Sequence, residues 1–334
     1  MKNILCNSTR NLHKVSIAPM MDCTDKHFRM LMRKISSKAL LYTEMIVVQS
    51  LIYTDKKEKF LGFNKAEHPL SIQFGGDNPE LLKDAAKIAQ DWGYDEINFN
   101  VGCPSPRVCS GNFGASLMKE PSKVAKCIDT LKSNCNLPVT IKHRIGVDNQ
   151  DSFEELNYFV KLVSKAGADR FTVHARKAIL KGLNPKQNRT IPPLKYDLVK
   201  KLKKVNPGLL IEINGGFTNI DQCEKALNDF DGVMIGRSAY KHPLLWTEID
   251  EKIYGESANK KSASQIILSL IPYIESHLKN GGATWDICKH LINLVERLPK
   301  AKIWRNKISQ KSINKELSME YLVKQTLELK EMGY

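Results

Sequence analysis

The chain has 334 residues, of which 42% are hydrophobic and 26% are charged, and this composition excludes a disordered or fibrous protein. Its 51 Lys and Arg against 36 Asp and Glu give a net charge of +15, which favours a polyanionic partner, nucleic acid first and an anionic membrane second. General solubilising surface charge is the alternative. The first residues contain no apolar run of signal-peptide length, and no stretch approaches the roughly 20 apolar residues that span a bilayer. We therefore expect a cytoplasmic protein without membrane contact.

The cysteines are scattered along the chain. There are eight, with no CxxC pair and no Cys/His cluster that has the spacing of a zinc site. In a chain of this length, such scattering is typical of reduced thiols in the cytosol rather than of a disulfide framework. We accordingly predict no metal centre.

Eight short apolar runs predict buried parallel strands in the first part of the chain, and segments with helical spacing separate them. The runs are 15–20, 39–45, 69–76, 96–103, 138–146, 170–176, 209–216 and 232–240. The clearest helices are 78–93, which Gly93 ends, and 151–168, with Asp151 as the predicted N-cap and Gly167 at its end. Eight strand–helix units predict a (β/α)8 TIM barrel. A doubly wound sheet is the alternative, but no GxGxxG motif follows the first strand.

The hydrophobic pattern changes after residue 245. Residues 249–264 read as a polar linker, and only helical patterns follow it. We predict a barrel domain over 1–248 and a small all-helical C-terminal domain over 249–334, with the boundary inside the polar linker 249–264.

Each predicted strand carries an unusual side chain near its C-terminal end. These residues are Met20 beside Pro19, Glu44, Gln73, Asn98 and Asn100, Lys142, His174, Asn214 and Arg237. Because the strands of a barrel are parallel, we expect these side chains to meet on one rim, where barrel enzymes have their active sites. Cys103 follows the fourth strand and is expected on the same rim, as a structural thiol, a metal ligand, or a catalytic acid or nucleophile.

The last two strands end in NGG (214–216) and GRSAY (236–240), which predicts a phosphate site with Arg237 as an additional donor. A plain tight turn is the alternative. Lys142 in a dry site favours a ligand that accepts a cation, and a flavin is such a ligand. Gln73 is expected to hydrogen-bond the polar edge of the ring. A metal at His174 is disfavoured, because its motif has no second histidine and no carboxylate.

Positive charge is concentrated in two segments. From Arg176 to Asn206 there are ten Lys or Arg and a single acid, and from Arg297 to Lys311 there are six and none. The first segment follows the sixth strand. The second lies in the predicted helical domain, where Trp304 either covers a base or packs. Each segment alone is typical of a solvated face, but the pair favours a long polyanion lying across both regions.

Over nearly its whole length, the chain resembles the tRNA-dihydrouridine synthases, and specifically their DusA branch. The motifs that carry the resemblance are APMMDCTDKHFR (18–29), YTEM (42–45), IQFGG (72–76), NVGCPSPRV (100–108), GNFGASLM (111–118), IKHRIG (141–146), HARKAILKGLNPKQNRTIPPL (174–194), INGG (213–216) and DGVMIGRSAYKHP (231–243).

The resemblance implies an FMN enzyme that uses NADPH to reduce a D-loop uridine of tRNA, at position 20 with 20a as an open second site. It implies that Cys103 is the general acid, protonating C5 of uracil after C6 has received a hydride. It implies FMN binding by Ala18, Pro19, Met20, Gln73, Lys142, His174, Asn214, Gly215, Gly216, Gly236 and Arg237. It also implies tRNA contacts from Asn100, Lys186, Arg189, Lys302 and Arg305. The segment around the last two departs from the family pattern, since Lys300 and Lys302 replace a glycine and an arginine.

Two other functions compete with this one. The first is an FMN-dependent TIM-barrel oxidoreductase that acts on a small molecule, which the two basic segments and the helical extension disfavour. The second is a non-catalytic tRNA-binding protein, which the presence of Cys103, Lys142 and His174 disfavours. No protein partner is indicated, and we expect a monomer.

Overall fold

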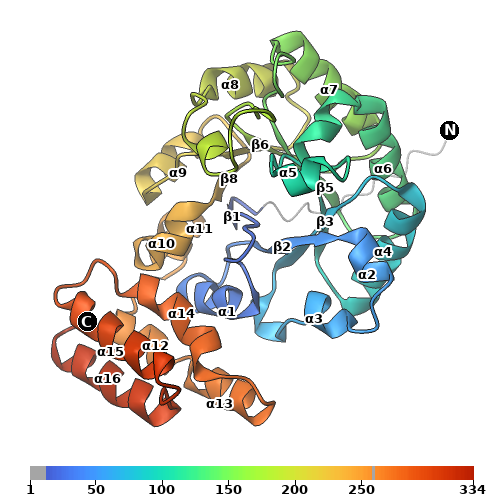
Figure 1. The fold of residues 1–334 in the computed structure, drawn as a ribbon. Coiled ribbons are helices and arrows are strands. Elements are labelled where there is room, and N and C mark those ends of the chain that lie inside the picture. Colours follow the sequence, from blue (N-terminus) through green and yellow to red (C-terminus); the bar gives the residue numbers. More distant parts are fainter. Residues whose placement is uncertain (1–12, 258–259) are drawn as a thin grey trace.

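The computed structural model describes residues 13–257 and 260–334, and Figure 1 shows a ring of strands surrounded by helices. All neighbouring strands are parallel, in the order β1-β8-β7-β6-β5-β4-β3-β2. The ring closes where the Ile17 amide donates to the Leu40 carbonyl (2.9 Å) and the Leu40 amide donates to the Val15 carbonyl (3.0 Å). The predicted TIM barrel is therefore confirmed.

The strands all fall within the predicted apolar runs, apart from the last residues of β2. They are β1 (Val15–Ile17), β2 (Leu41–Val47), β3 (Leu70–Gly75), β4 (Glu96–Val101), β5 (Val139–Arg144), β6 (Arg170–His174), β7 (Ile211–Asn214) and β8 (Gly232–Ile235). The short β8 ends before Arg237, which is the first residue of α10 (Arg237–Lys241) rather than part of a strand.

Helices follow every strand and cover the outside of the barrel (Figure 1). Besides α10 they are α1 (Lys26–Ile35), α2 (Val48–Ile52), α3 (Lys57–Leu61), α4 (Pro79–Trp92), α5 (Pro106–Cys109), α6 (Pro121–Ser133), α7 (Phe153–Lys165), α8 (Tyr196–Val205), α9 (Ile220–Leu227) and α11 (Ile249–Tyr254). Within the described residues, short 3-10 helices lie in the connections: η1 (Lys65–Glu67), η2 (Gly114–Lys119), η3 (Gln187–Arg189) and η4 (Pro243–Trp246).

The large apolar core lies between the strands and the helices, not inside the barrel. Outward side chains such as Ile72 and Phe99 are fully buried there. Inward side chains are mostly polar and bonded to one another. Arg170 Nη2, for example, donates to Glu96 Oε2 (2.7 Å) and to the Tyr42 hydroxyl (3.0 Å). Buried polar groups need such partners, so the barrel interior is a hydrogen-bonded network rather than an apolar plug.

The helix ends follow the local sequence, with one difference from prediction. Gly93 ends α4 in the left-handed conformation, as predicted (φ 85°). The N-cap of α7 is Ser152 and not Asp151, because the Ser152 hydroxyl accepts from the Glu155 amide and the Glu155 carboxylate reaches back to Ser152. The Asp151 carboxylate instead pairs with Lys177 (Nζ–Oδ2 2.9 Å).

The prediction of a polar linker over 249–264 is wrong for its first part. Residues 249–254 form α11, which packs against the barrel beside α9. Ile249 is fully buried and Ile253 nearly so, and the Tyr254 hydroxyl accepts from the amide of Val15 (3.0 Å). Ile249 and Ile253 are one helical turn apart and so lie on the same side of α11, and two such residues suffice to bury one side of so short a helix.

Five further helices form a bundle at one side of the barrel, coloured orange to red in Figure 1. They are α12 (Ala263–Leu268), α13 (Ile271–Lys279), α14 (Thr284–Leu294), α15 (Ala301–Ile313) and α16 (Met319–Glu331). Helices α12 and α14 pack on α1. Trp304 is buried in this bundle, and its Nε1 donates to the Gln325 carbonyl (3.2 Å), so it packs and does not face a base. That the bundle is an independent domain stays a prediction.

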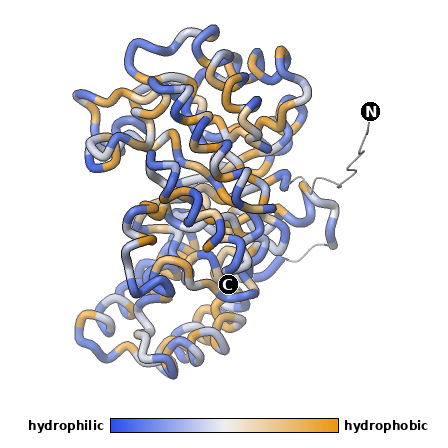
Figure 2. The backbone as a smooth tube through the Cα atoms, turned by 90° about the vertical axis from the view of Figure 1, so that its right-hand side faces the viewer, coloured by the Kyte–Doolittle hydropathy of each residue, from blue (hydrophilic) through white to orange (hydrophobic). Residues whose placement is uncertain are grey.

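Hydrophilic and hydrophobic positions alternate at short intervals along the tube in Figure 2. Within the described residues, no helix combines the length and the apolarity needed to cross a membrane.

Candidate active site at the carboxyl ends of the barrel strands

A chain of side-chain amides runs from the barrel interior to its carboxyl rim. Asn98 Nδ2 donates to Thr140 Oγ1 (2.9 Å), and Gln73 Nε2 donates to Asn98 Oδ1 (2.7 Å). Asn100 Nδ2 then donates to Gln73 Oε1 (2.9 Å), and Asn100 Oδ1 accepts from the Cys103 amide (3.0 Å). The strand register places Gln73 opposite Asn98. Along this series, from Thr140 to Cys103, each residue accepts a hydrogen bond from the next one. The three predicted rim residues of β3 and β4 therefore act together.

The loop that carries Cys103 is held from three sides. Asn100 Oδ1 accepts from the amides of both Gly102 (3.2 Å) and Cys103 (3.0 Å). The Cys103 carbonyl accepts from the Ala115 amide (2.9 Å), and the Gly102 carbonyl accepts from Arg144 Nε (2.9 Å). The Cys103 side chain itself is only partly buried. The fixed backbone presents this thiol at the rim, as the sequence predicted.

Lys142, His174 and Asn214 continue the rim along β5, β6 and β7, the strands that follow β4 in the sheet. Asn214 Oδ1 accepts from Lys142 Nζ (3.1 Å), while Asn214 Nδ2 donates to the Met234 carbonyl (2.8 Å). Burial and the nearby Arg144 lower the pKa of Lys142 to about 8. Of the described side chains, no carboxylate forms an ion pair with Lys142. Among the described residues, the hydrogen-bond partner of this cation is an amide oxygen and not a carboxylate, which suits an electron-rich ligand.

His174 contributes a polar atom with no partner. Its Nδ1 is buried and forms no hydrogen bond within the described part of the chain. Burial, followed by the positive charges of Arg144 and Lys142, moves the pKa of His174 well below its usual range, so the ring is neutral. Buried polar atoms are normally satisfied, and an unsatisfied one beside a rim points to a ligand.

The NGG turn after β7 requires glycine at its second and third positions. Gly215 (φ 117°) and Gly216 (φ 84°) both adopt the left-handed region. A Cβ at Gly215 would lie 3.0 Å from Leu194 Cδ2 and 3.3 Å from His174 Nε2. At Gly236 an added Cβ would meet Ala18 Cβ at 3.8 Å, an ordinary van der Waals contact, so Gly236 lies beside the loop that follows β1.

Three guanidinium groups gather beside these glycines. Arg237 Nη2 donates to the Arg189 carbonyl (3.0 Å), and burial together with the charges of Arg189 and Arg176 lowers the pKa of Arg237. Clustered like charges are unfavourable without an anion, so this edge is suited to a phosphate group. The predicted phosphate residues Gly215, Gly216 and Arg237 therefore lie together.

In the sequence, Arg144 stands out only as part of the motif IKHRIG (141–146), and the structure shows what it supports. Besides Gly102, its guanidinium donates to the carbonyls of Lys177 (3.1 Å) and Asn188 (3.0 Å). The Asn188 side chain, fully buried, bonds to both the amide and the carbonyl of Ile179 (2.8 Å each). Arg144 thus joins the loop after β4 to the basic loop after β6.

The first basic segment divides into paired and unpaired charges. Lys200 and Lys203 of α8 pair with Asp229 and Asp231 on the outside of the barrel. By contrast, four residues of the rim loop form no salt bridge with any described residue: Arg176, Lys181, Lys186 and Arg189. Lys186 and Arg189 are exposed. Lys201 and Lys204 of α8 also form no salt bridge with a described residue, so free positive charge lies both beside the rim and on α8.

The remaining predicted FMN residues lie in the loop after β1. The Ala18 amide donates to the Ile235 carbonyl (2.8 Å), and Pro19 and Met20 follow in the loop. Thr24 fixes this loop by accepting from the Met20 amide (3.0 Å). Glu44 lies in the irregular part of β2, and burial raises its pKa. The Glu44 side chain forms no hydrogen bond or ion pair with the other predicted rim residues that the structure describes.

Sequence reasoning missed the anchors of this loop. Arg29 of α1 pairs with the fully buried Glu67 (Nε–Oε2 2.6 Å) and donates to the Thr24 carbonyl (2.9 Å). Asp25 caps α1 through the amides of His27 and Phe28 and also reaches the helical bundle. Their motif, TDKHFR, was read only as part of a family resemblance.

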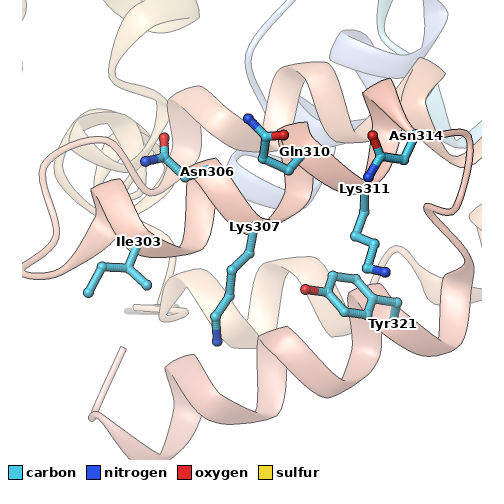
Figure 3. A pocket seen from close by; sticks show the side chains of 7 residues that line it. All are labelled: Ile303, Asn306, Lys307, Gln310, Lys311, Asn314 and Tyr321. Atoms are coloured by element: carbon cyan, nitrogen blue, oxygen red, sulfur yellow. The ribbon is translucent and has the colours of Figure 1, made fainter.

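The second basic segment lies on α15, away from the rim. Lys302 is exposed, and Arg305 is near Glu296 (3.8 Å). Figure 3 shows a groove between α15 and α16, toward which Lys307 and Lys311 extend. Both lysines are paired, with Glu328 (2.8 Å) and Glu316 (2.5 Å), so this groove carries little free charge.

Comparison with known proteins assigns the family. A family model described as dihydrouridine synthase matches residues 16–330. The chain belongs to the dihydrouridine synthase family. This confirms the resemblance seen in the motifs.

Individual relatives agree with the family. A tRNA-dihydrouridine(20/20a) synthase of Synechocystis sp. is 49% identical over 303 residues, covering 91% of this chain and 90% of the relative. Proteins of the same name from Shewanella oneidensis (47% identical; 91% and 90% covered) and Vibrio cholerae (46%; 89% and 90%) are also similar.

One solved structure shares the barrel at much lower identity. Morphinone reductase in complex with tetrahydroNAD has a TM-score of 0.51 and 13% identity, covering 76% of this chain and 90% of that chain. This likeness concerns the fold alone.

Proposed function

We propose that this protein is an FMN-dependent tRNA-dihydrouridine synthase that reduces the 5,6 double bond of a D-loop uridine, at position 20 or 20a, with NADPH as electron donor. The names of its relatives support the substrate. The observation that carries the proposal for this chain is the rim itself, where a backbone-fixed Cys103 faces a cationic, partly unsatisfied set of groups around Lys142.

The residues present fit FMN. Lys142, whose bonded partner is only an amide, and His174, whose Nδ1 has no partner among the described residues, would supply polar contacts to a flavin. Gly215, Gly216 and Arg237 would hold the phosphate, with Ala18, Pro19, Met20, Gln73 and Asn214 around the ring. When bound and reduced, FMN supplies the hydride that uracil C6 takes up.

Cys103 would supply the proton. The target uridine is stacked in folded tRNA, so it must turn out of the stack to enter the barrel mouth. There the Cys103 thiol protonates C5, a general-acid step for which a thiol is suited because it carries a transferable proton. The exposed Lys186 and Arg189 beside the mouth would hold the tRNA backbone, and Asn100, Lys302 and Arg305 are further proposed contacts.

The test is Cys103→Ala, with Cys109→Ala as the matched control from the same loop. Cys109 is also partly buried, and burial raises its pKa. We expect Cys103→Ala to keep bound flavin and tRNA affinity and to lose about 10²–10⁴-fold in the single-turnover rate of dihydrouridine formation, as for other general acids. Cys109→Ala should stay within about threefold of wild type. Equal rates in both variants would remove Cys103 from the mechanism.

The substrate needs a separate experiment. Unmodified tRNA, FMN and NADPH are incubated with the full chain, and dihydrouridine is mapped by base hydrolysis and primer extension. We expect one or two modified positions at 20 and 20a. Flavin binding without any tRNA product would favour the small-molecule oxidoreductase. A cytoplasmic location and a monomeric state stay predictions of the sequence.

A further inference from the structure

A cluster of metal-ligating side chains lies outside the candidate active site, at the junction of the barrel and the helical bundle. Ligand atoms of His27, His277 and Asp286 all lie within 4.8 Å of one another. His27 belongs to α1 of the barrel, His277 to α13 and Asp286 to the first turn of α14. His27 precedes His277 by 250 positions in the sequence, which explains why spacing motifs gave no sign of the cluster.

The two histidine rings already face each other in a restrained arrangement. Their centroids are 4.5 Å apart with an interplanar angle of 67°. His277 Nε2 lies 2.8 Å from Asp286 Oδ2, which also accepts from the Ala283 amide (3.0 Å). The carboxylate is thus oriented before any ligand arrives, as carboxylates in metal sites commonly are.

His27 has the outer partner that metal-binding histidines usually have. Its Nδ1 lies 2.8 Å from the Tyr273 hydroxyl, and Nε2 forms no hydrogen bond with any residue that the structure describes. The ring is 7% exposed. Because Nδ1 of His27 is held by Tyr273, Nε2 is the ring nitrogen that can bind a ligand.

We propose that His27, His277 and Asp286 bind a zinc ion that joins the helical bundle to α1 of the barrel, with water as the fourth ligand. Two imidazoles and one carboxylate favour zinc over magnesium or calcium, which prefer oxygen ligands. In a tetrahedral site the ligand atoms are about 3.3 Å apart, so each must move by on the order of 1 Å or less. Rotation of the partly exposed His277 and Asp286 side chains provides this movement.

The proposal revises the expectation that the chain has no metal site, and it does not depend on the proposed reaction. Zinc binding would affect how the helical bundle is attached to the barrel. The ligands come from both sides of one junction, and α1 continues directly from the loop of Met20 and Thr24. Zinc would therefore fix the position of the bundle relative to the barrel mouth.

The experiment measures zinc binding to the full chain by competition with a chromophoric zinc indicator. The test variants are His277→Gln and Asp286→Asn, both partly exposed and so expected to fold. The control is His68→Gln, because His68 also pairs with a carboxylate, that of Asp95 (Nδ1–Oδ2 2.6 Å), but without a third ligand. All these proteins retain the same eight cysteines, so thiol binding is common to them.

We expect wild type and His68→Gln to bind one zinc equivalent more than either test variant, or to bind it at least about tenfold more tightly. Hydrogen exchange provides the local readout. Zinc should slow exchange in α1, α13 and α14 of wild type and leave it unchanged in His277→Gln. Equal zinc binding in all four proteins, or protection confined to segments around cysteines, would overturn the site.

Discussion

Lys142 is the residue at which stability and proposed function oppose each other. Its pKa is lowered from 10.5 to about 8, mainly by burial, and its bonded partner is the neutral Asn214. A shift of this size corresponds to at most about 3 kcal/mol of unfavourable free energy for keeping the charged amine in the folded protein. A ligand that accepts this charge would recover part of that free energy, which is why the residue belongs to a binding site rather than to the barrel scaffold.

We expect Lys142→Met to make the flavin-free protein more stable at pH 7 and to weaken flavin binding by at least about tenfold. The folded protein binds fewer protons than the unfolded chain between pH 8 and 10.5, so the stability of the wild type should rise with pH across that window. The variant should lack this rise. Urea unfolding of flavin-free protein at several pH values measures both. If the two proteins show the same pH dependence, Lys142 is well solvated and the argument fails.

At the scale of elements, α11 is the segment whose structure differs most from the prediction, which was a polar linker. Ile249→Ala should lower the free energy of unfolding by about 2–5 kcal/mol, because Ile249 is fully buried where α11 covers the barrel. Lys252→Ala, on the exposed side of the same helix, should lower the free energy of unfolding far less, because the pairs of Lys252 with Glu248 (3.1 Å) and Asp221 (3.7 Å) are at the surface. Urea unfolding compares them. Similar small effects would mean that 249–254 behaves as the linker the sequence suggested.

Strands were predictable because buried parallel strands are short apolar runs, and eight of them leave few architectures. For the site, the residues that lie on the strands were predictable from the strand periodicity. In register, Gln73 lies opposite Asn98 and Asn100 lies opposite Lys142, so the meeting of these side chains follows from the parallel sheet. The hydrophobic periodicity does not reveal α11, because its inward apolar side chains are separated by polar ones. It also does not reveal the hydrogen bonds from Arg144 to backbone carbonyls, which join loops distant in sequence.

At the scale of the whole molecule, the link between the proposed flavin loop and the helical bundle depends on Asp25. One carboxylate oxygen caps α1 and accepts from His290 Nε2 (2.9 Å), and the other pairs with Lys289 (2.7 Å). Burial opposes its ionisation, but the bonds from His290, Lys289 and the Phe28 amide hold its pKa well below the usual range. Stability from this group should therefore be present above about pH 4 and decline as pH falls below it.

The exchange Asp25→Asn separates the two tasks of this side chain, since Asn caps a helix as well as Asp does but carries no charge for Lys289. We expect Asp25→Asn to keep α1 and flavin binding, to raise KM for tRNA about three- to tenfold, and to change kcat by less than about twofold. Asp25→Ala should in addition lose about 1 kcal/mol of stability from the missing cap.

Lys289→Met tests whether the charge pair is the cause. If it is, Lys289→Met should raise KM for tRNA as Asp25→Asn does, and the double variant should be little worse than either single one, because both remove the same pair. Steady-state kinetics with unmodified tRNA measures KM and kcat separately. Fully additive effects would show that Asp25 and Lys289 influence tRNA through different contacts. Unchanged KM in all three variants would show that bundle position does not govern how tRNA reaches the barrel mouth.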